Sequence, residues 1–283
     1  MADTQARQIM ERELPKAAPP KINTDEMSFL DHLEELRWRI IKGLMAILGG
    51  VVVAFIFSDY IIDVILLGPA YADFFVYRFV GIEAVDVVFQ NRRLPGQFFT
   101  YWGTLLLSGL IIGSPLMIYQ LWKFIEPALE TSEKKKTRFT VFIIIFLFLA
   151  GVSFGYLVLT PFAVQYFMQF QMSEVVRNDI DINAYFSIVS MWVLACGIIF
   201  QLPMISYTLS RIGILTPELM RKYRKIAIIF CFILAAFITP PDPISQLIIA
   251  IPLLLLYQFS IYISKIVNRK REKEIWGEKG APE

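Results

Sequence analysis

The sequence contains very few residues suited to covalent or metal chemistry. It has one histidine, His32, and two cysteines, Cys196 and Cys231, which lie in separate apolar runs. The cysteines form neither a C-x-x-C pair nor a spacing typical of metal sites, so we interpret them as small core residues. A G-x-x-x-x-G-K-[ST] segment is also missing, which argues against an ATP-driven pump within this chain.

A catalytic serine is poorly supported. Residues 151–155, "GVSFG", match the G-x-S-x-G pattern of serine hydrolases, but that pattern requires a strand-to-helix turn and a histidine partner. Ser153 lies in an apolar run that predicts a helix, and His32 belongs to a charged segment outside the apolar runs. We therefore interpret the two glycines here, and the pair Gly109 and Gly113, as positions where helices pack closely.

Charge is scarce where a transporter would need it. The net charge is +2, which indicates no basic surface for nucleic acid. The cores of the apolar runs contain no acidic or basic residue, and the third and sixth runs do not resemble copies of each other. A secondary transporter usually has charged or broken-helix sites at mid-membrane and an internal repeat. A transporter of a small solute remains the alternative function, and saturable uptake by the purified protein would favour it.

Apolar and aromatic residues are abundant instead. Hydrophobic residues make up 56% of the 283 residues, and the mean hydropathy is +0.57, whereas soluble domains are about 45–50% apolar. A membrane core about 30 Å thick needs about 20 helical residues. We predict an all-α integral membrane protein with six transmembrane helices. The apolar runs lie at about 41–58, 98–121, 139–160, 185–210, 226–238 and 244–264.

The fifth run is shorter than the others. Residues 226–238 give about 20 Å of helix at 1.5 Å per residue, and the "TPPDP" that follows prevents continuation. We therefore predict a short fifth helix and a locally thinned bilayer around 226–264. The second run contains Pro115, where we expect a kink, and the sixth contains Pro252.

Basic residues predict the orientation. With six spans, only four of the 27 Lys and Arg residues lie on the side opposite the termini: Arg78, Arg92, Arg93 and Arg177. Because cytoplasmic loops carry an excess of Lys and Arg, both termini are predicted to face the cytoplasm.

The ends of the chain differ in composition from the apolar runs. Residues 1–26 lack the apolar core of a signal peptide, and we predict a mobile N-terminal tail. The predicted membrane domain is 27–267, followed by a cytoplasmic C-terminal tail at 268–283. The first outer loop, 60–97, is long and compatible with a cap that contains helix and strand.

A charged segment, "SFLDHLEELRWRII" at 28–41, precedes the first apolar run. A capping pattern at Ser28 predicts a helix that begins at Phe29 and lies along the cytoplasmic interface. Glu35 and Arg39 are four residues apart and can pair. A solvated amphipathic helix would explain the arginines, but carboxylates beside anionic lipid are mildly unfavourable. The acids therefore indicate a place where a basic ligand could dock.

The first cytoplasmic loop has the same mixture of charges. Its segment "QLWKFIEPALETSEKKKTR" places Trp122 and Phe124 at the interface as aromatic anchors. Three acids follow before a basic run, ending with Glu133. Two acidic patches on one membrane face could form bidentate pairs with the arginines of a partner.

Four segments resemble the TatC family, the polytopic subunit of the twin-arginine protein translocase. They are "FLDHLEELRWR", "SPLMIYQLWKFIEPAL", "FGYLVLTPFA" and "TPPDPISQLIIAIPLLLLY". The resemblance covers about residues 27–268 and implies a multi-pass protein of the cytoplasmic (inner) membrane that exports folded proteins, driven by the proton-motive force. It implies no covalent catalysis and no cofactor. The implied partners are twin-arginine signal peptides and TatB-like and TatA-like single-span subunits in an oligomeric complex.

The resemblance also implies roles for matching residues. Glu35 and Glu133 match the acidic residues that contact the arginine pair of a signal peptide. Arg37, Arg39 and Phe124 match basic and aromatic residues of the same signal-peptide site. A polar cluster at the outer ends of the fifth and sixth helices, where the single-span partners would dock, contains Thr239 and Gln246. In the first outer loop, Pro69 matches a family proline.

Two positions depart from the family pattern. Gln201, in "FQLPMI", and Gln258 stand where many members carry glutamates in the fourth and sixth helices. Glutamine cannot titrate, so a proton relay at these positions is in doubt. A polar functional role at mid-membrane and hydrogen bonds that hold helices together are the two open interpretations.

Overall fold

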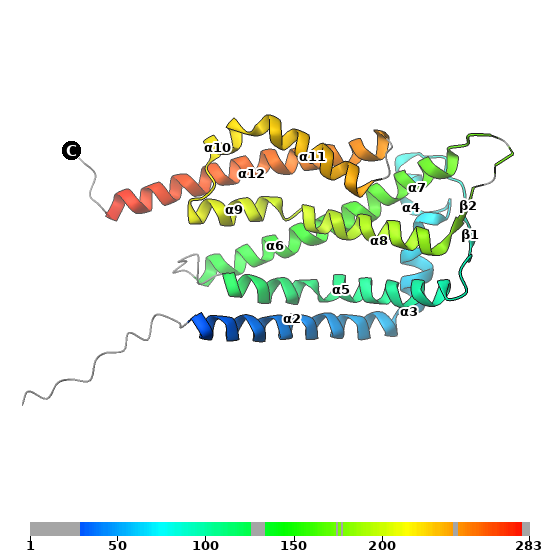
Figure 1. Cartoon of the computed structure of the whole chain (residues 1–283), viewed down its shortest axis with the longest axis horizontal. Coiled ribbons are helices and arrows are strands. Elements are labelled where there is room, and N and C mark those ends of the chain that lie inside the picture. Colours follow the sequence, from blue (N-terminus) through cyan, green and yellow to red (C-terminus); the bar gives the residue numbers. More distant parts are fainter. Residues whose placement is uncertain (1–28, 126–133, 174, 177, 240–242, 279–283) are drawn as a thin grey trace, which may run out of the picture. The chain divides into compact units, whose positions relative to one another are not determined.

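A computed structural model describes residues 29–125, 134–173, 175–176, 178–239 and 243–278. The chain divides into two units, residues 1–38 and 39–283. In the first unit, residues 29–38 form the start of helix α2 (Phe29–Ile56), which begins where the sequence predicts it. The rest of α2 and all other described elements belong to the second unit (Figure 1).

Helices dominate the second unit. After α2 the elements are α3 (Ser58–Tyr60), the π-helix η1 (Ile61–Leu66), the 3₁₀-helix η2 (Gly68–Ala70), α4 (Phe75–Val80), β1 (Val88–Gln90), α5 (Gly96–Ile125), α6 (Lys134–Phe154), the π-helix η4 (Gly155–Leu159), α7 (Thr160–Gln169), β2 (Asp179–Asp181), α8 (Ile182–Ile199), α9 (Leu202–Ile212), α10 (Pro217–Lys222), α11 (Arg224–Ile238) and α12 (Pro243–Glu278).

Six helical segments of the described chain are long and apolar enough to cross a membrane. They are Leu33–Ile56, Ser58–Val80, Gly96–Ile125, Phe139–Gln169, Ile182–Ile212 and Ser245–Lys273. Five of these overlap apolar runs that the sequence analysis predicts as spans. The all-α membrane fold with six candidate spans is therefore confirmed.

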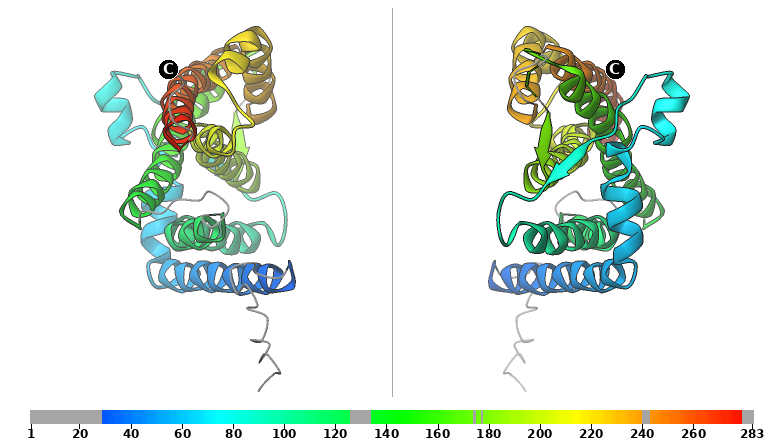
Figure 2. Two further views of the ribbon diagram at one scale, coloured as in Figure 1. Left: turned by 90° about the vertical axis from the view of Figure 1, so that its left-hand side faces the viewer. Right: turned by 90° about the vertical axis from the view of Figure 1, so that its right-hand side faces the viewer.

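The candidate span Ser58–Val80 matches no predicted span, because most of it lies in the predicted outer loop 60–97. It is not one helix, because it consists of α3, η1, η2 and α4 with irregular residues at 71–74. In Figures 1 and 2 these short elements cross the end of the bundle of α5, α6 and α8 instead of running along it. The predicted fifth span, α11, has 15 residues, or about 22 Å of helix, and its role as a span stays a prediction.

Two close helix crossings depend on glycine. A Cβ at Gly113 of α5 would lie 2.7 Å from the Ala46 carbonyl oxygen of α2, and one at Gly151 of α6 would lie 2.5 Å from the Cys196 carbonyl oxygen of α8. Real Cβ atoms essentially never come so close. The interpretation of these glycines as close-packing residues is confirmed, and Ser153 lies inside α6 without the strand-to-helix turn of a hydrolase.

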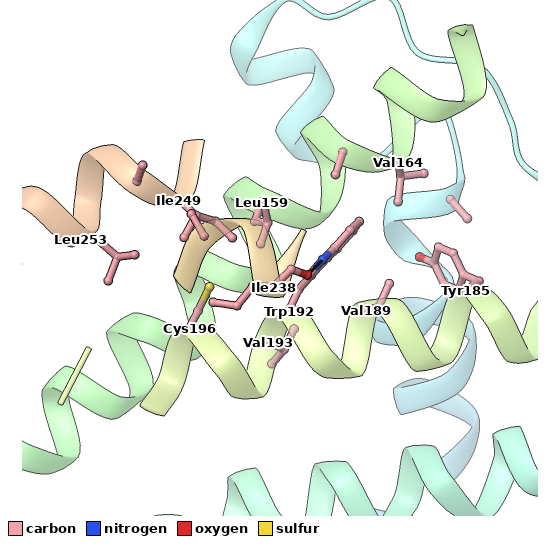
Figure 3. Close-up of a cluster of buried hydrophobic side chains, with 14 of the residues drawn as sticks. Leu159, Val164, Tyr185, Val189, Trp192, Val193, Cys196, Ile238, Ile249 and Leu253 are labelled. Carbon is pink, nitrogen blue, oxygen red and sulfur yellow. Dashed lines mark hydrogen bonds between the residues drawn. The ribbon is translucent and has the colours of Figure 1, made fainter. Parts of the chain in front are cut away.

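The main core joins α7, α8, α11 and α12 (Figure 3). Its largest side chain is Trp192, which is 2% exposed and donates its indole N–H to the Ile238 carbonyl oxygen at 3.0 Å. Cys196 and Cys231 are both buried in this core as free thiols, as the sequence predicts. Within a bilayer such contacts stabilise the bundle through close packing, because lipid is as apolar as the side chains.

Proline 115 lies inside α5 without ending it. A proline has no N–H for the carbonyl four residues earlier, which here is that of Ile111. The Ser114 hydroxyl donates to this carbonyl oxygen at 2.7 Å. The side chain thus supplies the hydrogen bond that the proline removes.

The predicted outer loops form a cap of mixed structure. Strands β1 and β2 pair in parallel, with Val88 opposite Asp179. The Gln165 side chain of α7 accepts from the Val85 N–H at 2.9 Å and donates to the Val85 carbonyl oxygen at 3.0 Å. Helix and strand therefore both occur in this region, and the strand pair joins two loops that are far apart in sequence.

Helix α12 extends into the segment 268–283, whose role as a cytoplasmic tail stays a prediction. The helix continues to Glu278. Asn268 anchors it, because its amide donates to the Leu215 carbonyl oxygen at 3.1 Å and to that of Ser264 at 2.9 Å. Asn268, the first residue of this segment, is thus bound to the loop after α9.

Candidate functional site

The predicted signal-peptide residues of the first unit lie on α2. Glu35 is half-buried, whereas Glu34 and Arg37 are exposed. Residues two apart on a helix are about 200° apart around its axis, so Glu35 and Arg37 are on different sides of α2. One carboxylate is therefore partly shielded, whereas the charges at Glu34 and Arg37 are exposed.

Two further predicted residues lie in the second unit. Arg39 and Phe124 are both half-buried, on α2 and near the end of α5. A Cβ at Gly43 of α2 would lie 3.3 Å from the side chain of Met117 on α5, and α2 and α5 run antiparallel at the glycine crossings. Arg39, one turn before Gly43, and Phe124 are therefore at the same end of this helix pair. Glu133 lies outside the described residues.

Pro69 is buried in η2, next to η1, and tyrosines donate to carbonyl oxygens of both short helices. Its carbonyl oxygen accepts the Tyr77 hydroxyl. Tyr156 and Tyr185 donate to carbonyl oxygens of η1 at 2.6 and 2.9 Å. A π-helix has irregular backbone hydrogen bonding and is common at functional sites. Two phenols fix this one to η4 and α8, and Tyr77 of α4 fixes the adjacent η2.

The predicted polar cluster binds the backbone of α11. Thr239 is 4% exposed and donates to the Ala235 carbonyl oxygen at 2.9 Å. Gln246 of α12 donates to the Phe232 carbonyl oxygen at 3.2 Å. Both side chains thus stabilise α11, which a proline-rich segment follows in the sequence, and Thr239 presents little surface of its own.

The two glutamines have different environments. Gln201, half-buried between α8 and α9, donates to the Ile144 carbonyl oxygen of α6 at 3.1 Å. Gln258 is exposed on α12. The interpretation of Gln201 as a link between helices agrees with this bond, whereas Gln258 faces outward from the bundle.

The structure does not bring all the predicted residues together. Phe124 lies at the far end of α5 from the cap, whereas α11 reaches Thr239 at the cap end (Figure 1). The sequence analysis missed the aromatic donors Tyr77, Tyr156 and Trp192. Their signal was available, because a phenol or indole within an apolar run needs a hydrogen-bond partner. Among the described residues, no cluster of His, Cys, Asp or Glu could hold a metal.

The pKa of Asp181, in the cap region outside the candidate spans and α11, is clearly perturbed. Asp181 caps α8 by accepting from the Asn183 N–H at 2.8 Å. This hydrogen bond to the ionised carboxylate is the main cause that holds the pKa of Asp181 below its ordinary value of 3.8. The cap is therefore charged at neutral pH.

Comparisons with known proteins agree with the fold. The family model described as "Sec-independent protein translocase protein (TatC)" matches residues 31–252. The TatC protein of Blattabacterium sp. subsp. Periplaneta americana is 37% identical over 265 residues, covering 89% of this chain and all of that protein. The TatC protein of Aquifex aeolicus is 33% identical over 248 residues, covering 87% of this chain and 98% of that protein.

Solved structures are similar as well. The structure titled "Crystal Structure of Twin Arginine Translocase Receptor- TatC" has a TM-score of 0.68 and 33% identity, covering 84% of this chain and 100% of its own. A second, in DDM, has a TM-score of 0.70 and 34% identity, covering 83% and 99%. Sequence, fold and coverage agree, and this multi-pass membrane protein belongs to the TatC family of Sec-independent protein translocase subunits.

Proposed function

We propose that the protein recognises twin-arginine signal peptides and provides the scaffold for export of folded proteins, driven by the proton-motive force. The observation that carries this proposal is Glu35, a half-buried carboxylate on α2, within the segment matched by the TatC family model. A solved relative with 33% identity is titled a twin-arginine translocase receptor. In this proposal the protein is a receptor and not an enzyme.

The chemistry of arginine suits such a site. A guanidinium group stays charged at any physiological pH, and its planar fork matches a carboxylate in a bidentate pair. Lysine is a point charge and cannot form this pair. A partly shielded carboxylate also interacts more strongly than an exposed one, because less water screens the charge. Glu35 thereby favours paired arginines, with Glu133 as the second predicted carboxylate.

The proposed topology has both termini in the cytoplasm of a cell whose inner membrane the chain crosses six times. The spans in this proposal are α2, α5, α6 with η4, α8 with α9, α11 and α12. Ser58–Val80 is then part of the outer cap, which agrees with its broken helices. TatB-like and TatA-like single-span subunits would bind at the outer ends of α11 and α12, near Thr239 and Gln246.

Crosslinking tests the proposed site. A photo-crosslinker next to the arginine pair of a signal peptide should label the wild-type protein, and Glu35→Ala or Glu133→Ala should reduce the yield. Glu34→Ala is the matched control, because Glu34 is exposed on the same helix. Each variant must have the same unfolding temperature as the wild type, so that a lower yield cannot come from unfolding. Unaltered crosslinking in the Glu35→Ala, Glu133→Ala double variant would remove both residues from the site.

A further inference from the structure

Four exposed cationic side chains flank Tyr223, where α10 ends and α11 begins: Arg221, Lys222, Arg224 and Lys225. We call these four residues the basic cluster. Glu218 is the only acidic residue of α10, and α11 contains none. The two helices therefore carry four cations against one acid. Such an excess of exposed positive charge favours an anionic partner.

Helix α12 fixes the position of the basic cluster. The Tyr257 hydroxyl of α12 donates to the carbonyl oxygen of Met220, the residue before the cluster, at 2.8 Å. Asn268 of α12 binds the loop before α10 through the Leu215 carbonyl oxygen. Tyr257 and Asn268 are separated by about 16 Å of helix. Helix α10 therefore runs back along α12, away from the charged C-terminal end of α12.

The part of α12 beside the basic cluster is apolar. Before Lys265, α12 contains no acidic or basic residue, so it offers the cations no counter-charge at this level. Phe259, Tyr262 and Ile266 are 52%, 60% and 40% exposed, and all three lie within the candidate span Ser245–Lys273. Because the exposed apolar surface of a span faces lipid, the cluster lies beside a surface that lipid covers.

The short helix α11 brings the basic cluster to the level of the lipid headgroups. Its 15 residues give about 22 Å of helix, less than the membrane core of about 30 Å. A span that is too short requires a locally thinner bilayer. Tyr223 is 46% exposed, and the Lys222 ammonium lies 5.7 Å from its ring centroid. Tyrosine is enriched at the membrane–water interface, so the start of α11 has the composition of that interface.

We propose that the basic cluster binds the phosphate of an anionic glycerophospholipid, such as phosphatidylglycerol, and thereby draws headgroups toward α11. Each Lys or Arg near a membrane surface strengthens the binding of anionic lipid about fivefold. Phosphatidylcholine fits less well, because the cations repel its choline. A soluble acidic peptide also fits less well, because the neighbouring surface of α12 is apolar. The inference rests on the proposed placement of α11 and α12 as spans, but not on signal-peptide recognition.

The test measures lipid preference at the cluster itself. The full chain is reconstituted in phosphatidylcholine vesicles with a small, equal fraction of either phosphatidylglycerol or phosphatidylcholine that carries a diazirine near the ester end of one acyl chain. Crosslinks are mapped in chymotryptic peptides, because the variants below remove tryptic sites. In the wild type, phosphatidylglycerol should label residues 217–226 about tenfold more than phosphatidylcholine. Salt at about 1 M should reduce this preference severalfold, because it screens the charges.

Two variants that lose the same charge assign the preference to the cluster. The cluster variant should label equally with both lipids, and its changes are Lys222→Gln, Arg224→Gln and Lys225→Gln. The control variant should keep the preference of the wild type, and it neutralises three exposed cations at the charged end of α12: Arg269→Gln, Lys270→Gln and Lys273→Gln. Both must retain the unfolding temperature of the wild type. Lys225→Gln alone should lower the preference about fivefold, and it replaces the cluster variant if that protein unfolds.

Three results would overturn the proposal. Equal labelling of the wild type by the two lipids would show that the cluster holds no anionic lipid. Equal losses in the cluster and control variants would mean that the preference reflects only the general charge of this end of the molecule. Displacement of phosphatidylglycerol by a soluble acidic peptide would assign the cluster to a protein partner. None of these results depends on whether the protein binds a signal peptide.

Discussion

Single polar side chains hold this bundle by binding backbone carbonyl groups of other elements. Trp192, Gln246 and Gln201 each donate across a helix interface, and Tyr156 does the same for η1. Such bonds matter in a bilayer, because an unpaired polar group in hydrocarbon is costly. A polar residue within an apolar segment can therefore stabilise the packing of helices, even where the sequence suggests a functional site.

Gln201 allows this distinction to be tested. Gln201→Leu removes the hydrogen bond to Ile144, so we expect a loss of about 1 kcal/mol in the free energy of unfolding, with export retained. The measurements are unfolding in detergent and export of a twin-arginine cargo in cells that lack their own TatC. Gln258→Leu, at an exposed position, is the control and should change neither. Loss of export by a Gln201→Leu protein that folds normally would show a functional role.

Asp181 gives a pH-dependent prediction. Its pKa is lowered in the folded state by the hydrogen bond from Asn183. A lowered pKa contributes stability that is fully present above the ordinary value of 3.8, which applies to the unfolded chain. The contribution is lost as the pH falls through the folded pKa. Hydrogen exchange of the first turn of α8 should therefore accelerate below about pH 4 in the wild type.

Asp181→Asn is the matched variant, because asparagine can also cap a helix but carries no charge. Its exchange rates should lack this acid-dependent increase after correction for the intrinsic pH dependence of exchange. If the wild type and Asp181→Asn respond to acid identically, the charge of Asp181 has no part in the cap.

Close packing sets the spacing of neighbouring helices. Gly151 of α6 leaves no room for a side chain, because the backbone of α8 occupies the place of a Cβ. Backbone atoms cannot rotate away, so an added methyl group must move a helix. The same holds for Gly113 of α5 against α2.

Gly151→Ala should therefore destabilise the protein by about 1–3 kcal/mol, the usual cost of overpacking a core. Thermal unfolding of the detergent-solubilised protein measures this cost. Gly49→Ala provides the comparison, because a Cβ at Gly49 meets no atom within 4 Å and alanine favours a helix by about 1 kcal/mol. An unchanged unfolding temperature for Gly151→Ala would mean that the crossing of α6 and α8 is loose.

Apolar periodicity and length were sufficient to predict five of the six candidate spans and the start of α2. They were not sufficient where tertiary contacts decide the structure. The sequence analysis did not predict that α12 continues to Glu278 or that Asn268 binds the loop after α9. Ser58–Val80 is as apolar as a span, yet it is broken into short elements. The parallel pairing of β1 with β2 joins distant loops, and nothing local in either sequence encodes the partner.

The predicted site could be placed only in part. Glu35, Arg37, Arg39 and Phe124 have defined exposures, and Glu133 lies outside the described residues. Motif spacing identifies such residues but cannot show how far each is shielded from water, because burial depends on neighbouring helices. The shielding of Glu35 and the hydrogen bonding of Thr239 therefore could not be predicted from the sequence.

The topology of the whole molecule can be tested with single cysteines. Cys196 and Cys231 are buried, so a membrane-impermeant thiol reagent should react with introduced cysteines alone. Leu94→Cys, at a fully exposed position between β1 and α5, should be labelled from outside the cell. Tyr223→Cys, half-exposed before α11, should be labelled from the cytoplasmic side only. Labelling of Leu94→Cys from the cytoplasm would mean that Ser58–Val80 crosses the membrane.

The most direct test of signal-peptide recognition is a double-mutant cycle between Glu35 and the arginine pair. The dissociation constant of a signal peptide with two arginines, or with two lysines, is measured against the purified wild type and Glu35→Gln. If Glu35 binds a guanidinium group, arginine-to-lysine replacement should weaken binding by the wild type about tenfold more than binding by Glu35→Gln. This ratio corresponds to a coupling of about 1.4 kcal/mol. An equal loss in both proteins would contradict the account.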